Sequence, residues 1–156
     1  MDLVINGHNH VYERTDPLRD GKVALRAPIG ASYNSAAGTT YIAAGTGGAG
    51  FYAFNAPQSF EGNVNHVESI KTQYVATIDG QLDPQTVTWS RSRYAGYGFL
   101  AVDVQPGRKG QATTMTVRSV SEQGAELDRV TLRRTAGEVS AATRGVSRAA
   151  PDLSAS

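Results

Sequence analysis

Apolar and polar residues alternate along much of this chain, and alternation with a period of two predicts β-strands. In residues 97–104, Leu100, Val102 and Val104 fall on one side of the extended chain, and the residues between them fall on the other. Similar runs, many of them rich in β-branched and aromatic residues, occur at residues 2–6, 22–27, 39–44, 72–78, 86–90, 112–120 and 125–133. The pattern therefore predicts a mostly β fold with little helix.

The segments between these runs carry turn signals. Asp79-Gly80 is typical of a hairpin turn, Asp83-Pro84 indicates another turn, and residues 121–124 join the last two strands as a hairpin. Residues 28–38, rich in Gly, Ala, Ser and Asn, are expected to form a loop. Residues 57–70 are expected to form a surface connection, with a helical turn or two over residues 63–70.

Residues 1–134 form one predicted domain, and the remainder has a different composition. Residues 135–156 are rich in Ala, Ser, Arg and Gly and contain few large apolar groups. Such a segment buries too little surface to offset the entropy of ordering it, so we expect disorder.

The composition excludes several functional classes. The 156 residues have a formal net charge of +1, so no basic field indicates nucleic-acid binding. Cysteine is absent, which excludes disulfides and thiolate metal sites. No apolar run approaches the length of a membrane span, and the N-terminus lacks the pattern of a signal peptide.

The chemistry of the chain is concentrated in residues 6–14, which follow the apolar run Leu3-Val4-Ile5 and read Asn-Gly-His-Asn-His-Val-Tyr-Glu-Arg. In an extended chain, residues i and i+2 project to the same side, so His8 and His10 are expected to direct two imidazoles at one place. Imidazole is a good ligand for Zn, Fe and Cu. Gly7 leaves room for the backbone to turn close to a bound group.

This string resembles the G-H-x-H-x-Y-E-R signature of the purple acid phosphatases, which are calcineurin-like metallophosphoesterases. The resemblance implies that His8 binds one metal ion of a dinuclear centre and His10 the other, with Gly7, Tyr12, Glu13 and Arg14 supporting the loop. An alternative for the last three is that Tyr12 only packs and that Glu13 and Arg14 form a solvated ion pair.

The family resemblance also implies a fold, a cofactor and a substrate. The fold would be the C-terminal portion of an α/β/β/α-type sandwich, the cofactor two metal ions (Fe, Zn or Mn), and the substrate a phosphate ester. The resemblance also implies secretion, whereas the sequence itself leaves the localisation of the chain unknown. Trp89-Ser90 and Tyr97-Gly98-Phe99 stand in the family's order, so the likeness spans about residues 2–134.

The family's other ligand motifs are absent from this chain. The missing strings are an Asp-x-Asp-like strand end, G-D-x-x-Y, G-N-H-[DE] and a later histidine motif. Two histidines cannot build a tight metal centre, because even one structural zinc takes four ligands. We therefore expect the C-terminal fragment of a metal-dependent phosphoric ester hydrolase, inactive in isolation. The alternatives are a non-catalytic β-rich binding module that retains a relic motif, and an assembly in which another chain supplies the missing ligands.

The glycine-rich loop after residues 39–44 reads Gly45-Thr46-Gly47-Gly48-Ala49-Gly50. Its G-x-G-x-x-G spacing does not indicate dinucleotide binding, because no helical pattern follows. The phosphatase family has a similar Gly-Thr-Gly-Gly loop near its metal cleft, which implies that Gly45, Thr46, Gly47 and Gly48 border the site. The alternative is a tight glycine turn without a functional role.

Three further polar residues are weaker candidates. Asp16 and Asp20 are expected to be solvated turn residues, with support of the metal ligands as the alternative. His66 is expected to be a surface histidine, with a substrate contact as the alternative. The strand at residues 2–6 is expected to be an exposed sheet edge that is open to association.

Overall fold

The computed structural model describes residues 1–54, 60–66, 69–75 and 82–135, and these residues are mostly β. The strands are β1 (Leu3–Asn6), β2 (Tyr12–Thr15), β3 (Leu18–Arg19), β4 (Lys22–Val23), β5 (Ala31–Asn34), β6 (Thr40–Ala44), β7 (Ile70–Val75), β8 (Leu82–Val87), β9 (Ser90–Tyr94), β10 (Gly98–Gln105), β11 (Thr113–Ser121) and β12 (Glu126–Arg134). The helical structure in this described part is one 3₁₀ turn, η1 (Ser35–Ala37). The expectation of a mostly β chain with little helix is confirmed.

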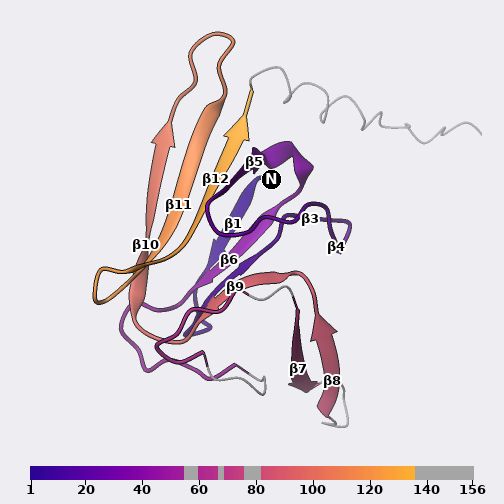
Figure 1. The fold of residues 1–156 in the computed structure, drawn as a ribbon, viewed down its shortest axis with the longest axis vertical. Helices are drawn as coiled ribbons and strands as arrows, with labels where there is room; N and C mark the ends of the chain where they lie inside the picture. Colours follow the sequence, from indigo (N-terminus) through magenta and orange to yellow (C-terminus); the bar gives the residue numbers. More distant parts are fainter. Residues whose placement is uncertain (55–59, 67–68, 76–81, 136–156) are drawn as a thin grey trace, which may run out of the picture.

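Two four-stranded sheets form the body of the molecule (Figure 1). The first has the order β1-β6-β2-β9, and its strands β1 and β6 run parallel. The second has the order β10-β11-β12-β5, with β12 and β5 parallel and the other pairs antiparallel. The β11–β12 pair and the strand at Gly98–Gln105 confirm the predicted hairpin and its preceding strand.

The core lies between the two sheets. The first sheet contributes Tyr12, Ile42 and Tyr94 to one buried cluster, and the second contributes Tyr33, Val117, Leu127, Val130 and Leu132. The hairpin of β7 and β8 stands apart from the long strands β10–β12 (Figure 1) and has a cluster of its own, built on Phe60, Ile70 and Val87. The two sheets therefore share one hydrophobic interior, as in a β-sandwich.

β1 is an edge strand, as the sequence predicted. Among the described residues it pairs with β6 alone, and Ile5 lies beside the fully buried Ile42 but is 48% exposed. At the edge of the other sheet, Val102 and Val104 of β10 are 46% and 49% exposed, although Val102 pairs with the buried Val117. Apolar side chains of the inner faces are thus left uncovered at two sheet edges.

Some predicted boundaries are wrong. Residues 28–38 are not all loop, because Ala31–Asn34 pairs with β12 and buries Tyr33. The strand expected over residues 22–27 is reduced to Lys22–Val23. Asp83 and Pro84 lie within β8 rather than in a turn. In the part of the chain that the structure describes, β8 pairs only with β7, and an edge strand tolerates a proline that donates no ladder hydrogen bond.

The helical turns expected over residues 63–70 do not form in the described part, where residues 63–66 are irregular and Ile70 begins β7. Residues 67–68, the Asp79-Gly80 turn and the tail from residue 136 lie outside the described residues. Within the described part, no helix is long and apolar enough to cross a membrane.

Candidate functional site

The histidine loop (residues 7–11) and the glycine loop (residues 45–50) meet at one edge of the first sheet. They follow β1 and β6, which are parallel neighbours, with Asn6 paired to Ala43 (Figure 1). Loops at the carboxyl ends of adjacent parallel strands are a common place for ligand binding in α/β folds. The topology therefore brings together two segments that lie about forty residues apart in the sequence.

The histidine loop is not extended. Asn9 donates its N–H to the carbonyl of Gly7 at 3.0 Å, Val11 donates to Asn9 at 2.9 Å, and His8 has a φ of 74°. The expectation that His8 and His10 project together as alternate residues of an extended chain is therefore wrong. A left-handed φ at a residue other than glycine costs free energy, and such residues are often found at functional sites.

His10 is held by three contacts. Its Nδ1 lies 2.7 Å from the carbonyl oxygen of Gly50, its ring stacks on Tyr52 with 4.3 Å between centroids, and its own carbonyl accepts the N–H of Tyr52 at 3.0 Å. A carbonyl oxygen only accepts hydrogen bonds, so Nδ1 carries a proton, and in the neutral imidazole Nε2 is then the nitrogen with the lone pair. His8 is exposed and has no hydrogen-bond partner in the described part of the chain.

The four candidate residues of the glycine loop differ in what they touch. A Cβ added at Gly45 would lie 1.9 Å from the carbonyl oxygen of Asn9, so the two loops pack against each other there. The Thr46 hydroxyl donates to the carbonyl oxygen of Gly98 in β10 at 2.9 Å, and the Thr46 carbonyl oxygen accepts the Gly98 N–H at 3.1 Å. Gly47 and Gly48 face open space. Gly45 and Thr46 thus fix the position of the loop, and the alternative of a tight glycine turn without a functional role stays open.

Tyr12 and Arg14, from the same string as the histidines, lie inside the sandwich. Arg14 binds Asp128 of β12 through Nε at 2.5 Å and Nη2 at 3.0 Å, and Tyr12 donates its hydroxyl to Asp128 at 2.8 Å. Arg14 is 0% and Asp128 1% exposed. The interpretation of Arg14 as half of a solvated ion pair with Glu13 is wrong, because its partner is a buried aspartate on the other sheet.

The environment shifts the pKa values of these two residues. Burial raises the pKa of Tyr12 well above its usual value, and the charge of Asp128 adds to this. Burial alone would lower the pKa of Arg14, but the hydrogen bond and charge of Asp128 raise it above its ordinary value. Asp128 therefore keeps Arg14 charged and Tyr12 neutral, which suits a structural link between the sheets.

Glu13 points away from that link. It accepts a hydrogen bond from the Ser90 hydroxyl and lies opposite Arg93 in the pairing of β2 with β9. Burial raises the pKa of Glu13, while Ser90 and the charge of Arg93 act in the opposite direction. Glu13 thus holds β2 to β9 and does not reach the histidine loop through any of these contacts.

Asp16 is not the solvated turn residue that the sequence suggested. It is 0% exposed, forms two hydrogen bonds with Arg91 at 2.8 and 3.0 Å, and accepts the N–H of Ala27 at 2.8 Å. Burial would raise the pKa of Asp16, but these hydrogen bonds and one from Arg26 lower it below its ordinary value. Asp20, in contrast, is exposed in the turn between β3 and β4.

His66 is half-buried rather than fully at the surface. It lies near the backbone of Leu127, beside Asp128 on β12, and its Nδ1 is buried without a hydrogen-bond partner among the described residues. Burial lowers the pKa of His66, and the charge of Asp128 opposes this. His66 therefore packs against β12, a different place from the histidine loop.

A complete metal site is not present among the described residues. No three His, Cys, Asp or Glu side chains within residues 1–54, 60–66, 69–75 and 82–135 gather closely enough to hold a metal ion. His8 and His10 offer two imidazole nitrogens, whereas catalytic zinc sites use three protein ligands and structural ones four. The donor chemistry fits part of a metal centre but does not complete one.

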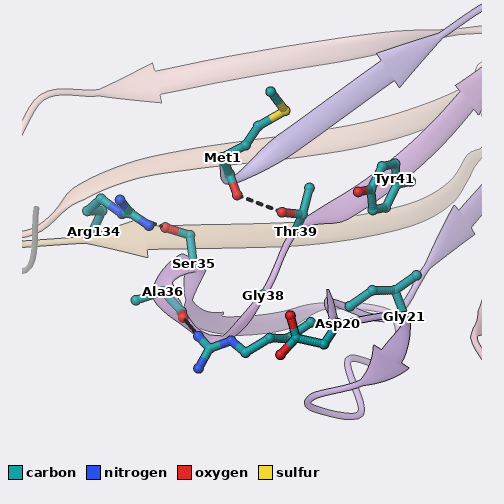
Figure 2. Close-up of a pocket in the computed structure, with 11 residues that line it drawn as sticks. Met1, Asp20, Gly21, Ser35, Ala36, Gly38, Thr39, Tyr41 and Arg134 are labelled. Atoms are coloured by element: carbon teal, nitrogen blue, oxygen red, sulfur yellow. Dashed lines mark hydrogen bonds between the residues drawn. The ribbon is translucent and has the colours of Figure 1, made fainter. Parts of the chain in front are cut away.

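A pocket of about 510 Å³ lies at the opposite end of β1 and β6, where Met1 and Thr39 precede the two strands (Figure 2). Arg19 and Arg134 line it, but both are already engaged. Arg19 donates to the carbonyl of Ala36, and Arg134 binds Ser35 at 3.1 Å and Asp2 at 2.6 Å. Part of the N–H donors of each arginine is therefore already used in contacts within the protein.

Comparison with known proteins finds two relatives in Mycobacterium tuberculosis. Both are named only as uncharacterized proteins, one from strain CDC 1551 / Oshkosh and one from strain ATCC 25618 / H37Rv. Each is 31% identical over 134 residues, covering 74% of this chain and 23% of the relative. The chain thus spans about a quarter of the length of these relatives. No family model matches the chain, and no solved structure matches it.

Proposed function

We propose that this chain is the C-terminal part of a metal-dependent phosphoric ester hydrolase of the purple acid phosphatase type, to which it contributes His8 and His10 as metal ligands. The observation that carries the proposal is the division within residues 6–14. Tyr12 and Arg14 are buried and partnered, whereas the two histidines lie in a loop beside the glycine loop, where the neutral imidazole of His10 carries its lone pair on Nε2. A motif that served packing alone would have no need of the histidines.

The architecture supports the finer part of the proposal. Two facing sheets with a parallel pair, β1 and β6, and loops at the carboxyl ends of that pair are compatible with one half of an α/β/β/α sandwich. The matched region makes up 23% of each mycobacterial relative, so a complete protein of this kind has ample sequence for the remaining ligands. The uncovered side chains of Ile5, Val102 and Val104 fit a sandwich that further sequence would extend.

The division of labour follows from the chemistry of phosphate esters. A pair of metal ions (Fe, Zn or Mn) would acidify a bound water and neutralise the developing charge on the ester. The residues of this chain would bind and orient the metal ions. His8 and His10 would each supply one imidazole nitrogen, and the Gly50 carbonyl fixes the proton on His10. Gly45 lets the glycine loop pack against Asn9, and Thr46 ties the glycine loop to Gly98 of β10.

The proposal is tested by assaying the purified chain, loaded with Zn²⁺ or Mn²⁺, against an aryl phosphate. Because two imidazoles do not complete a dinuclear centre, we expect little or no turnover. Strong hydrolysis that disappears in the His8→Ala and His10→Ala variants would show a complete enzyme and contradict assignment as a part of one.

A second candidate function, a non-catalytic binding module, is favoured by the free edge of β1 and the exposed Ile5 beside it. An open edge with an apolar side chain can accept a strand from another chain. The His8→Ala and His10→Ala variants separate this candidate from the first, because a relic motif loses no function when its histidines are removed. Size-exclusion chromatography with light scattering tests association of the chain. Elution at monomer mass counts against an assembly in which a second chain supplies the missing ligands.

A further inference from the structure

His10 receives contacts from two residues that the sequence did not single out. Gly50 lies at the end of the glycine loop, and Tyr52 follows it by two residues. The Gly50 carbonyl accepts from Nδ1 at 2.7 Å, and the Tyr52 ring lies almost parallel to the imidazole, with 17° between the planes. The backbone N–H of Tyr52 also binds the His10 carbonyl at 3.0 Å, which anchors both ends of the contact.

These contacts select a tautomer and a ring orientation that a free histidine would not favour. A neutral imidazole in water prefers its proton on Nε2, and its ring rotates broadly about the second side-chain torsion. A carbonyl oxygen beside Nδ1 selects the other tautomer, because only a protonated Nδ1 can donate to it. A stacked aromatic ring restricts rotation of the imidazole, so the lone pair of Nε2 keeps one direction.

We infer that Tyr52 is a positioning residue for His10: its ring, together with the Gly50 carbonyl, holds the imidazole as the Nδ1–H tautomer and presents Nε2 to the ligand. The orientation itself follows from these contacts alone. Its use for a metal ion rests on the proposed function.

His8 provides an internal comparison. It is exposed, and in the described part of the chain it has neither a hydrogen-bond partner nor a stacked ring. Tyr52 is 50% exposed and lies in irregular structure, so truncating its side chain should leave the folded core intact. The chain contains three histidines, which makes each imidazole resolvable by NMR.

The test is a two-bond ¹H–¹⁵N correlation spectrum of the metal-free, ¹⁵N-labelled chain at about pH 8.5, roughly two units above the ordinary histidine pKa. Spectra of His8→Gln and His66→Gln variants assign the signals. We expect His10 to show a protonated Nδ1 and His8 to show mainly a protonated Nε2. An identical tautomer ratio at His8 and His10 would overturn the inference.

Two substitutions at Tyr52 separate the effect of its aromatic ring from the effect of the backbone contacts. Tyr52→Ala should shift His10 toward the Nε2–H tautomer, whereas Tyr52→Phe, which keeps an aromatic ring, should retain the wild-type signals. If Tyr52→Ala leaves the His10 signals unchanged, Tyr52 does not position the imidazole. The His66 signals should be the same in all three proteins, since His66 is half-buried and a general loss of folding would move its signals as well.

Titration with Zn²⁺ alone separates this inference from the proposed function. If Zn²⁺ binds through His10, loss of the Tyr52 ring should weaken that binding about 10-fold or more, as other outer partners of metal ligands do. Binding through His10 with equal affinity in wild type and Tyr52→Ala contradicts the inference. A fixed His10 tautomer in a chain that binds no Zn²⁺ would support the inference and count against the proposed function.

Discussion

The two halves of residues 6–14 have opposite environments, although they are adjacent in the sequence. Tyr12 and Arg14 lie inside the sandwich and share Asp128 as their partner. His8 and His10 lie in a bent loop at the sheet edge, where His8 is exposed and His10 is half-buried. A motif identified by its letters thus contains a structural part and a part that is available for chemistry.

This difference separates two meanings of a functional motif. Removing one partner of a buried ion pair leaves the other charge desolvated and uncompensated, which strongly destabilises the folded protein. The effect of Tyr12, Arg14 and Asp128 should therefore appear in the free energy of unfolding. An exposed histidine with a left-handed φ adds no favourable packing, so a benefit from it is expected in ligand binding rather than in stability. Substitutions in the two halves should therefore give different readouts, and the following predictions use that contrast.

The largest effect is expected at the buried pair. Asp128→Ala leaves the Arg14 guanidinium without its carboxylate in a dry interior, so the free energy of unfolding should fall by about 3–5 kcal/mol. Chemical denaturation measures this loss. Asp103→Ala, which removes an exposed carboxylate from β10, is the matched control and should change stability by less than about 0.5 kcal/mol. Equal effects of the two substitutions would mean that the pair does not link the sheets.

The contact between the two loops comes next. Gly45→Ala places a Cβ against the backbone of Asn9, so the loops must separate, at a cost of about 1–3 kcal/mol. Gly47→Ala, two residues further on, meets open space and should be nearly neutral. Amide chemical shifts of residues 7–11 should move in the first variant and stay in place in the second. Unmoved shifts in Gly45→Ala would show that the glycine loop does not position the histidines.

The pH dependence of stability tests the second buried aspartate. Because Arg91, the Ala27 N–H and Arg26 lower the pKa of folded Asp16, its contribution is present above the ordinary aspartate pKa and is lost as the pH falls through the lower folded value. Wild type should therefore lose more stability than Asp16→Asn when the pH falls from about 7 to about 3. Denaturant titrations at both pH values measure the difference, and parallel losses in the two proteins would exclude this role.

The smallest effect is expected at His8. Its φ of 74° suits glycine better than alanine, so His8→Gly should be more stable than His8→Ala by about 1 kcal/mol. Thermal unfolding of the two variants checks this. Equal stability would mean that the loop does not hold a left-handed residue at this position in solution.

The strands that the sequence predicted best are those whose alternation is local. Residues 97–104 and the two strands of the last hairpin carry their own apolar pattern, and they form β10, β11 and β12. β5 was missed because its composition resembles a loop and because its partner, β12, lies about one hundred residues away. Short strands of this kind are fixed by tertiary pairing rather than by intrinsic preference.

For the candidate site, too, the sequence indicated local features but not the contacts between distant segments. The two histidines were recognisable from their motif, and the glycine loop from its composition. The bent conformation of the histidine loop was not, because a φ of 74° at His8 has no signal in a single sequence. Tyr52 and Gly50 were also missed, since nothing local indicates that they meet a histidine forty residues earlier. The aromatic residue soon after the glycines was the one available hint.

The most direct test of the central claim is a titration of the ¹⁵N-labelled chain with Zn²⁺, followed through its three imidazoles. If His8 and His10 are the metal ligands, their ring signals should shift or broaden in a saturable way while His66 is unaffected, and the His8→Ala, His10→Ala double variant should lose the response. Weak binding is expected, because two ligands do not complete a site. Signals of His8 and His10 that stay unchanged up to millimolar Zn²⁺, or a response centred on His66, would contradict the claim that this loop is part of a metal centre.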